Sequence, residues 1–134
     1  MAGLSPKLPL SKDPDDGYTL NKTLKELARQ NLKMLILTSP GERIMIPQFG
    51  VGLRHYLFEN ATDEVLSELR FKIIDQARIY LPYITINSVN FHQEFSGTGG
   101  LPIEPSSNSN YLHLSIDYSI DSDFSTETLI INLV

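Results

Sequence analysis

The stretch TSPGERIMIPQFGVGL, residues 38–53, sets the architecture of the chain because it separates two helical patterns. It contains three glycines and two prolines. Pro fixes its own backbone angle, and Gly adopts angles that other residues avoid, so together they define particular turns. We therefore expect Gly41, Pro47, Gly50 and Gly52 to shape a structured loop between the two helices.

Two interpretations of the side chains in this loop remain open. In the first, the loop is a packed connection: Met45, Phe49 and Leu53 lie on the core, while Glu42 and Arg43 pair in solvent. In the second, the loop contacts a partner, and Glu42 and Arg43 form charged hydrogen bonds across the interface or within the loop. An isolated surface ion pair would contribute little to stability.

Helical periodicity precedes the loop. Apolar residues from Leu20 to Ile36 recur every three or four positions, and charged residues occupy the other face. Thr23 and Glu26 have the spacing of a capping box, so the helix begins there or a few residues earlier. Ser39-Pro40-Gly41 ends it.

A second helical pattern follows the loop. Thr62 is a suitable N-cap, and acidic residues follow it in the first turn, where they complement the helix dipole. Apolar residues then recur at helical spacing up to Tyr80, and Pro82 ends the helix. Between the loop and Thr62, residues 53–58 predict a short amphipathic turn or helix.

After Pro82 the hydrophobic period changes to two, which is typical of strands. Alternation shifts parity near Asn87-Ser88, which predicts a β-bulge. Two further strands are expected over residues 112–118 and 128–134, with a Gly/Ser/Asn/Pro-rich loop at 96–110. The expected class is α+β: two main helices on one face of a three-stranded antiparallel meander.

The first 17 residues differ from the rest in composition. They contain three prolines among polar residues, which predicts an extended N-terminal arm. Leu4, Leu8 and Leu10 alternate with polar and Pro positions, so the arm could lie along a partner or along its own domain; the alternative is a partly ordered terminus. At 134 residues, the remainder, residues 18–134, fits one domain with one core.

Composition excludes several classes of function. The formal net charge of −5 and the lack of a basic run argue against a nucleic-acid partner. Cysteine is absent, which excludes disulfides and thiolate metal sites. No apolar run approaches the roughly 20 residues that span a bilayer, and no signal-peptide pattern is present. We expect a soluble protein that is intracellular when made, with no membrane partner.

Motifs for catalysis are also missing. Gly97-Thr98-Gly99-Gly100 lacks the Lys-Ser/Thr of a phosphate-binding loop, and no nucleophile elbow occurs. The three histidines lie in different elements without ligand spacing, and His113 falls on the polar side of its strand. Among the carboxylates near the loop (Glu42, Glu59, Asp63 and Glu64), none is marked as a buried acid. We expect no enzyme activity, cofactor, metal or small-molecule substrate.

The loop and its flanks resemble a known family. The pattern consists of a leucine-rich helix followed by Pro40-Gly41-Glu42-Arg43, Met45, Pro47, Phe49-Gly50, Gly52-Leu53 and Leu57-Phe58-Glu59. It resembles the baseplate wedge and tail-sheath initiator family of contractile-tailed phages. The corresponding baseplate subunit of type VI secretion systems is related. The resemblance extends from about residue 17 to the C-terminus.

The resemblance implies a structural subunit of the tail baseplate, located in the virion and assembled in the host cytoplasm. Such a subunit binds the core bundle and other wedge proteins and lies close to the tail tube. Six copies initiate polymerisation of the sheath protein by exchanging strands. The implied partner-binding residues are Glu42, Arg43, Phe49, Leu53, Pro82, Tyr83, Leu129, Ile131 and Leu133. The last three belong to the C-terminal strand, and two possibilities stay open: its edge accepts a partner strand, or the strand is central and already paired.

One position departs from the family pattern. Many relatives have Glu-Pro-Arg where the long helix meets the first strand, and this chain has Leu81-Pro82-Tyr83. If those charges dock the core bundle in relatives, the contact here must be apolar or aromatic. Two alternatives to the structural role also remain open: a tail-associated, lysozyme-like glycan hydrolase, and a regulatory module like a small bacterial anti-adaptor protein that shares this fold.

Overall fold

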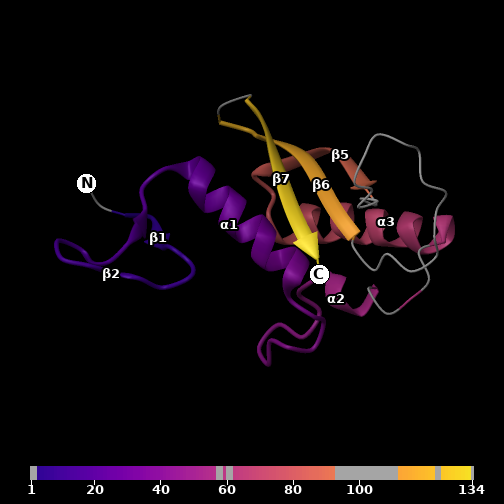
Figure 1. The fold of residues 1–134 in the computed structure, drawn as a ribbon, viewed down its shortest axis with the longest axis horizontal. Coiled ribbons are helices and arrows are strands. Elements are labelled where there is room, and N and C mark those ends of the chain that lie inside the picture. The colour runs from indigo at the N-terminus through magenta and orange to yellow at the C-terminus, as the bar shows by residue number, and fades with distance from the viewer. Residues whose placement is uncertain (1–2, 57–58, 60–61, 93–111, 123–124, 134) are drawn as a thin grey trace, which may run out of the picture.

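A computed structural model describes residues 3–56, 59, 62–92, 112–122 and 125–133. In this part of the chain, three helices and a three-stranded sheet form the body of the molecule, and two small strand pairs form its N-terminal extension (Figure 1). The mixed α+β class predicted from the sequence is confirmed. The 96–110 segment and Leu57-Phe58 lie outside the described residues.

Helix α1 (Leu24–Leu37) begins with the predicted capping box. The Thr23 hydroxyl accepts a hydrogen bond from the Glu26 amide, and the Glu26 carboxylate accepts one from the Thr23 amide. These reciprocal bonds satisfy amides that the first helical turn leaves unpaired. One stripe of the helix is fully buried: Ala28, Leu32, Leu35 and Ile36.

Two further helices follow the loop. Helix α2 (Leu53–Tyr56) is a single turn that buries Leu53. Helix α3 (Asp63–Tyr80) has Thr62 as its N-cap, as predicted, and Leu81 as its C-cap. It buries Leu69, Ile73 and Ala77. The interval of four between these residues places them on one face.

Strands β5 (Ile84–His92), β6 (Leu112–Ile120) and β7 (Thr126–Leu133) form an antiparallel sheet in the order β5-β6-β7. The register between β5 and β6 shifts between Ile86 and Ser88, so the predicted bulge is confirmed. This extra residue explains the change of parity, because it turns the following side chains to the other face.

The sheet buries only one of its faces. On β6, Leu114, Ile116, Tyr118 and Ile120 point into the core, while the intervening residues are partly exposed. The buried residues of α1 and α3 belong to the same core, and both helices lie along one side of the sheet (Figure 1). An ion pair between Lys25 and Glu127, with 3.6 Å between Nζ and Oε1, links α1 to the start of β7.

The N-terminal segment was predicted to be an extended arm along a partner or along its own domain, and it lies along its own domain as two short antiparallel strand pairs. Strand β1 (Ser5–Pro6) pairs with β4 (Leu20–Asn21), and β2 (Lys12–Asp13) pairs with β3 (Gly17–Tyr18). We call residues 3–21 the arm hairpin. Its prolines stay compatible with this structure because the strand pairs are only two residues long. The hairpin lies by the N-terminal part of α1 (Figure 1).

Candidate partner-binding loop

Residues 38–52 form a closed loop at the C-terminal end of α1, which projects from the body of the molecule (Figure 1). The Gly41 amide donates to the Pro47 carbonyl at 2.7 Å and closes the neck of the loop. The Glu42 carboxylate accepts a hydrogen bond from the Ser39 amide at 3.0 Å, and the Glu42 amide donates to the Ser39 carbonyl at 3.1 Å. Glu42 therefore holds the loop in its own turn.

The base of the loop depends on two glycines. Gly50 has a φ of +113°, and its amide donates to Oε1 of Gln76 on α3 at 3.0 Å. Gly52 has a φ of +72°, and its amide donates to the Thr38 carbonyl at 2.9 Å. A Cβ at Gly50 would overlap that same Thr38 carbonyl. Both glycines were predicted to shape the loop. Their positive φ angles and the neighbouring atoms that a Cβ would meet explain why Gly suits these two positions.

Phe49 anchors the loop to the body. Its ring is buried and meets the Tyr80 ring edge-on, with 5.0 Å between centroids. The Arg43 guanidinium also lies over the Phe49 ring. The distance from Arg43 Cζ to the ring centroid is 3.9 Å, which makes this a cation–π contact. Glu42 and Arg43 thus each hold the loop, one through the backbone and one through Phe49, and are not paired with each other as the packed interpretation proposed.

The tip of the loop presents apolar side chains to solvent. Ile44 is 93% exposed and Met45 is 92% exposed, and Ile46 beside them is also exposed. The expectation that Met45 packs onto the core is wrong. The hydrogen bond between Gly41 and Pro47 closes the loop and leaves the intervening side chains pointing outward. In the sequence, the exposed tip corresponds to a short apolar run between a Pro-Gly pair and a second Pro.

The other predicted partner residues lie in two places. Leu53, Leu129 and Ile131 have their side chains in the core, so a partner would meet them only through their backbone or through the surface they support. Leu133 lies in β7 opposite Leu112 of β6.

The corner after α3 lies next to the loop. Pro82 is exposed, and the Tyr83 hydroxyl accepts a hydrogen bond from Asn31 Nδ2 of α1 at 2.8 Å. Phe49 packs on Tyr80, the last residue of α3, so the loop and this corner are neighbours.

The sheet has two outer strands. Because β6 is central, β5 and β7 each present one edge that carries no strand within the described residues. Edge strands offer unpaired backbone groups to a strand from another chain.

A shallow hollow of about 370 Å³ lies beside the base of the loop and contains two carboxylates, Glu59 and Glu68. His55, Tyr56 and Lys72 also line it. Burial raises the pKa of Tyr56 above its ordinary value, and the two carboxylates add to the rise. Glu59 was among the carboxylates considered from the sequence, and Glu68 was not. Glu68 lines the same hollow because of its position on helix α3.

The carboxylates considered from the sequence do not meet in one place. Glu42 is bound to the Ser39 amide, and Asp63 and Glu64 are exposed in the first turn of α3. Within the described residues, no group of three or more His, Asp or Glu side chains is placed to hold a metal ion. None of the helices described has both the length and the apolar character that a membrane crossing requires.

The fold and the loop define a class: a small α+β domain with a hydrogen-bonded, apolar-tipped loop and, within the described residues, two outer sheet edges without a neighbouring strand, features suited to assembly. The family model described as baseplate wedge protein gp25 matches residues 22–124. The chain therefore belongs to the gp25 baseplate wedge family.

Solved structures agree with this assignment. A chain of the anti-feeding prophage baseplate is similar, with a TM-score of 0.70 and 26% identity, over 87% of this chain and 83% of that one. A Geobacter sulfurreducens protein, provisionally named a tail lysozyme, matches with a TM-score of 0.66 and 18% identity, over 86% and 94%. The second likeness shows the fold alone. No curated protein matches in sequence. The family and the baseplate relative support a structural role in a phage or phage-like tail baseplate.

Proposed function

We propose that this chain is a non-enzymatic baseplate wedge subunit that docks onto a neighbouring wedge protein through the tip of its loop. The observation that carries this proposal is the exposure of Ile44 and Met45 on a loop whose backbone is already fixed. Exposed apolar side chains scattered singly are ordinary, but two adjacent ones at the end of a closed turn form a prominent contact.

Rigidity makes the tip a favourable contact. Hydrogen bonds at Gly41 and Glu42 hold its neck, and the stack of Arg43 on Phe49 holds its side. A preordered loop loses little conformational entropy when it binds, so more of the burial energy appears as affinity. Full burial of an Ile or Met side chain stabilises by about 1.5–3 kcal/mol. The tip therefore has the size of an interface hot spot.

We further propose that the chain initiates sheath polymerisation through the outer edge of β7. In this account a strand of the first sheath ring pairs with β7, and six copies around the tube template that ring. Support comes from the position of β7 at the side of the sheet and from the alternation of its side chains, with Leu129 and Ile131 inward and Ile130 outward. The incoming strand would bind through the backbone of β7.

The corner at Pro82 and Tyr83 is proposed as the contact with the core bundle. Exposed Pro82 supplies an apolar surface, and Tyr83 is held by Asn31 and lies only partly exposed. A contact of this kind replaces the charged one that the family pattern implies, and its proximity to Phe49 makes it continuous with the loop. Assembly of this particle would occur in the host cytoplasm, as for other virion components.

Co-expression with the neighbouring wedge and sheath proteins tests the proposal. We expect a stable complex on sizing, with sheath rings visible by electron microscopy only when this chain is present. A chain that stays monomeric with every tail protein would contradict the proposal and favour a regulatory module. Peptidoglycan turnover that is lost in Glu59→Gln or Glu68→Gln would instead establish a hydrolase.

A further inference from the structure

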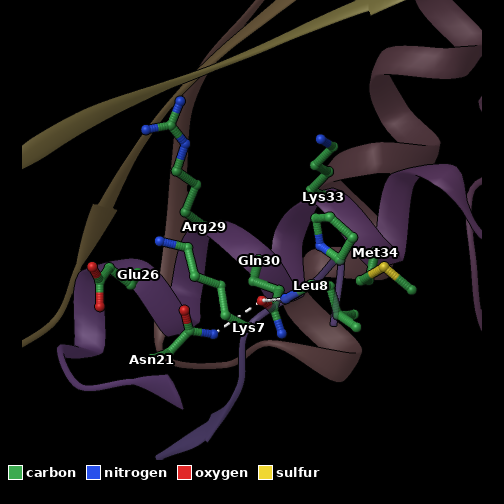
Figure 2. A pocket seen from close by; sticks show the side chains of 9 residues that line it. Lys7, Leu8, Asn21, Glu26, Arg29, Gln30, Lys33 and Met34 are labelled. Atoms are coloured by element: carbon green, nitrogen blue, oxygen red, sulfur yellow. Dashed lines mark hydrogen bonds between the residues drawn. The ribbon is translucent and has the colours of Figure 1, made fainter. Parts of the chain in front are cut away.

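A groove lies between the arm hairpin and helix α1, and none of the loop residues 38–52 lines it. Its volume is about 620 Å³. Figure 2 shows its lining, with Lys7, Leu8 and Asn21 contributed by the hairpin and the other labelled side chains spread along α1. The lining residues are Lys7, Leu8, Pro9, Asn21, Glu26, Arg29, Gln30, Lys33 and Met34.

One side chain fixes the hairpin wall of this groove. Gln30 accepts hydrogen bonds from the Leu8 amide at 2.9 Å and from Asn21 Nδ2 at 3.0 Å, the two dashed lines of Figure 2. Gln30 also donates to the Pro6 carbonyl at 3.0 Å. Asn21 is buried and donates to the Ser5 hydroxyl as well. The hairpin is therefore held against α1, and the groove is a formed feature of the fold.

The groove is positively charged in a chain with a net charge of −5. Lys7, Arg29 and Lys33 line it, and in the part of the chain that the structure describes none of them forms an ion pair with a carboxylate. Arg29 and Lys33 are four residues apart on α1, a like-charge spacing that slightly destabilises a helix. An anionic ligand bound between them would offset this repulsion.

The single carboxylate in the lining, Glu26, offsets only part of the charge of the three cations. Glu26 is occupied by the capping box, where its carboxylate accepts hydrogen bonds from the Lys22 and Thr23 amides. Those backbone bonds hold the pKa of Glu26 below its ordinary value, with a smaller contribution from Lys7. The charge of Glu26 is already directed at the helix N-terminus.

Apolar surface lies among the cations. Leu8, Pro9 and Met34 are exposed in the groove. From Glu26 to Met34 the helix rises about 12 Å, which matches about four residues of extended chain. Cationic and apolar side chains therefore lie next to one another over this length. An extended peptide with carboxylates on either side of an apolar residue would place its carboxylates on the cations and its apolar residue on the apolar surface.

We propose that this groove binds an extended acidic segment of a neighbouring baseplate protein, through Lys7, Arg29 and Lys33 around the apolar surface of Leu8 and Met34. The inference rests on the proposed baseplate role. The hairpin wall of the groove precedes residue 22, where the family match begins, and the α1 wall lies within the match. The groove would be a second docking point, separate from the loop tip.

The first test is fluorescence anisotropy with the full chain and labelled eight-residue peptides. One peptide alternates Glu with Leu, a second alternates Lys with Leu, and a third alternates Glu with Ser. The double variant Arg29→Glu/Lys33→Glu removes the cations. The matched control is Arg54→Glu/Arg78→Glu, which makes the same change of net charge on exposed residues outside the groove.

We expect the Glu/Leu peptide to bind at least tenfold more tightly than either other peptide. Its affinity should fall at least tenfold in the groove variant, stay within twofold in the control, and weaken with added salt. Equal binding to the groove variant, equal affinity for the Glu/Ser peptide, or tighter binding of an oligo-dT of the same length would overturn the proposal. No tail protein is present in this assay, so its result is independent of the co-expression experiment.

A second test identifies the occupant in the co-expressed complex. Carbodiimide joins a lysine to a carboxylate that it contacts, and mass spectrometry locates the bond. We expect Lys7 or Lys33 joined to an acidic segment of another baseplate protein. A bond from these lysines to a second copy of this chain, or none at all in a complex that has formed, would contradict the proposal.

Discussion

Replacement of Gly50 by alanine should destabilise the protein by about 3–5 kcal/mol. A φ of +113° is strained for any residue with a Cβ, which contributes about 1–3 kcal/mol. The new Cβ would also overlap the Thr38 carbonyl, which accepts the Gly52 amide, and would displace the Gly50 amide from Gln76. Each weakened hydrogen bond adds about 1 kcal/mol.

Other glycines of the chain serve as matched controls. Gly41 (φ +88°) and Gly17 (φ +79°) also have positive φ, but a Cβ at either would meet open space. Alanine there should cost about 1–2 kcal/mol, the backbone strain alone. Gly52→Ala should fall between, because its Cβ would lie 2.9 Å from Pro40 Cδ and 3.2 Å from His55 Cδ2, which are longer approaches than that of a Cβ at Gly50 to the Thr38 carbonyl.

Urea unfolding followed by circular dichroism measures these differences. The midpoint for Gly50→Ala should fall while the slope stays that of the wild type, since the surface exposed on unfolding is unchanged. Native domains have about 5–15 kcal/mol of stability, so the expected loss is a large part of the total. If Gly50→Ala and Gly41→Ala agree within about 0.5 kcal/mol, a close approach to Thr38 does not govern this position and the description of the loop base is wrong.

Three smaller perturbations test other parts of the structure. Tyr118→Phe should keep or raise stability by up to about 1 kcal/mol in urea unfolding, because the buried Tyr118 hydroxyl has no hydrogen-bond partner among the described residues; a loss above that amount would reveal a partner. Asp117 accepts hydrogen bonds from Thr128 and Ser88, which hold its pKa below its ordinary value, so its contribution to stability should be complete above about pH 5 and be lost as the pH falls through the lower, folded pKa. Asp117→Asn should flatten the acid limb of a stability-against-pH curve, and an unchanged limb would refute this. Gln30→Ala should speed amide hydrogen exchange in the arm hairpin and leave α3 unaffected, since Gln30 holds the hairpin to α1; equal protection in both proteins would contradict that role.

Local sequence signals predicted the regular elements well. The Thr23–Glu26 capping box and the Thr62 N-cap appear at the predicted helix starts, because a cap depends only on residues within one turn. The bulge near Ser88 was visible as a change of parity, since each strand has one buried face.

Features that depend on distant contacts were not predictable in the same way. The arm hairpin was missed because its strand pairs are short and Gln30, far along the chain, holds them in place. The outward direction of Met45 belongs to a loop that is closed by the hydrogen bond between Gly41 and Pro47 and by the contacts of Glu42 and Arg43. Hydrophobicity alone predicts burial, and here the backbone geometry overrides it.

The groove could not be found from sequence either. Lys33 and Arg29 read as the solvated face of an amphipathic helix, and nothing in their spacing shows that the arm hairpin covers that face. Glu68 likewise gave no local sign that it shares a hollow with Glu59.

The central claim is that the loop tip docks onto a wedge partner. Calorimetry tests it most directly, by measuring the affinity of the wild-type chain, a loop variant and a control variant for that partner. The test variant is Ile44→Ser/Met45→Ser, and the matched control is Phe71→Ser/Ile79→Ser, which removes two exposed apolar side chains of α3 (73% and 58% exposed). Loss of two buried apolar anchors predicts a Kd about 100-fold weaker for the loop variant, since about 1.4 kcal/mol corresponds to tenfold. The control should stay within about threefold of wild type, a difference of less than 1 kcal/mol. Wild-type affinity in the loop variant, with the fold intact by circular dichroism, would show that the loop tip is not the docking surface.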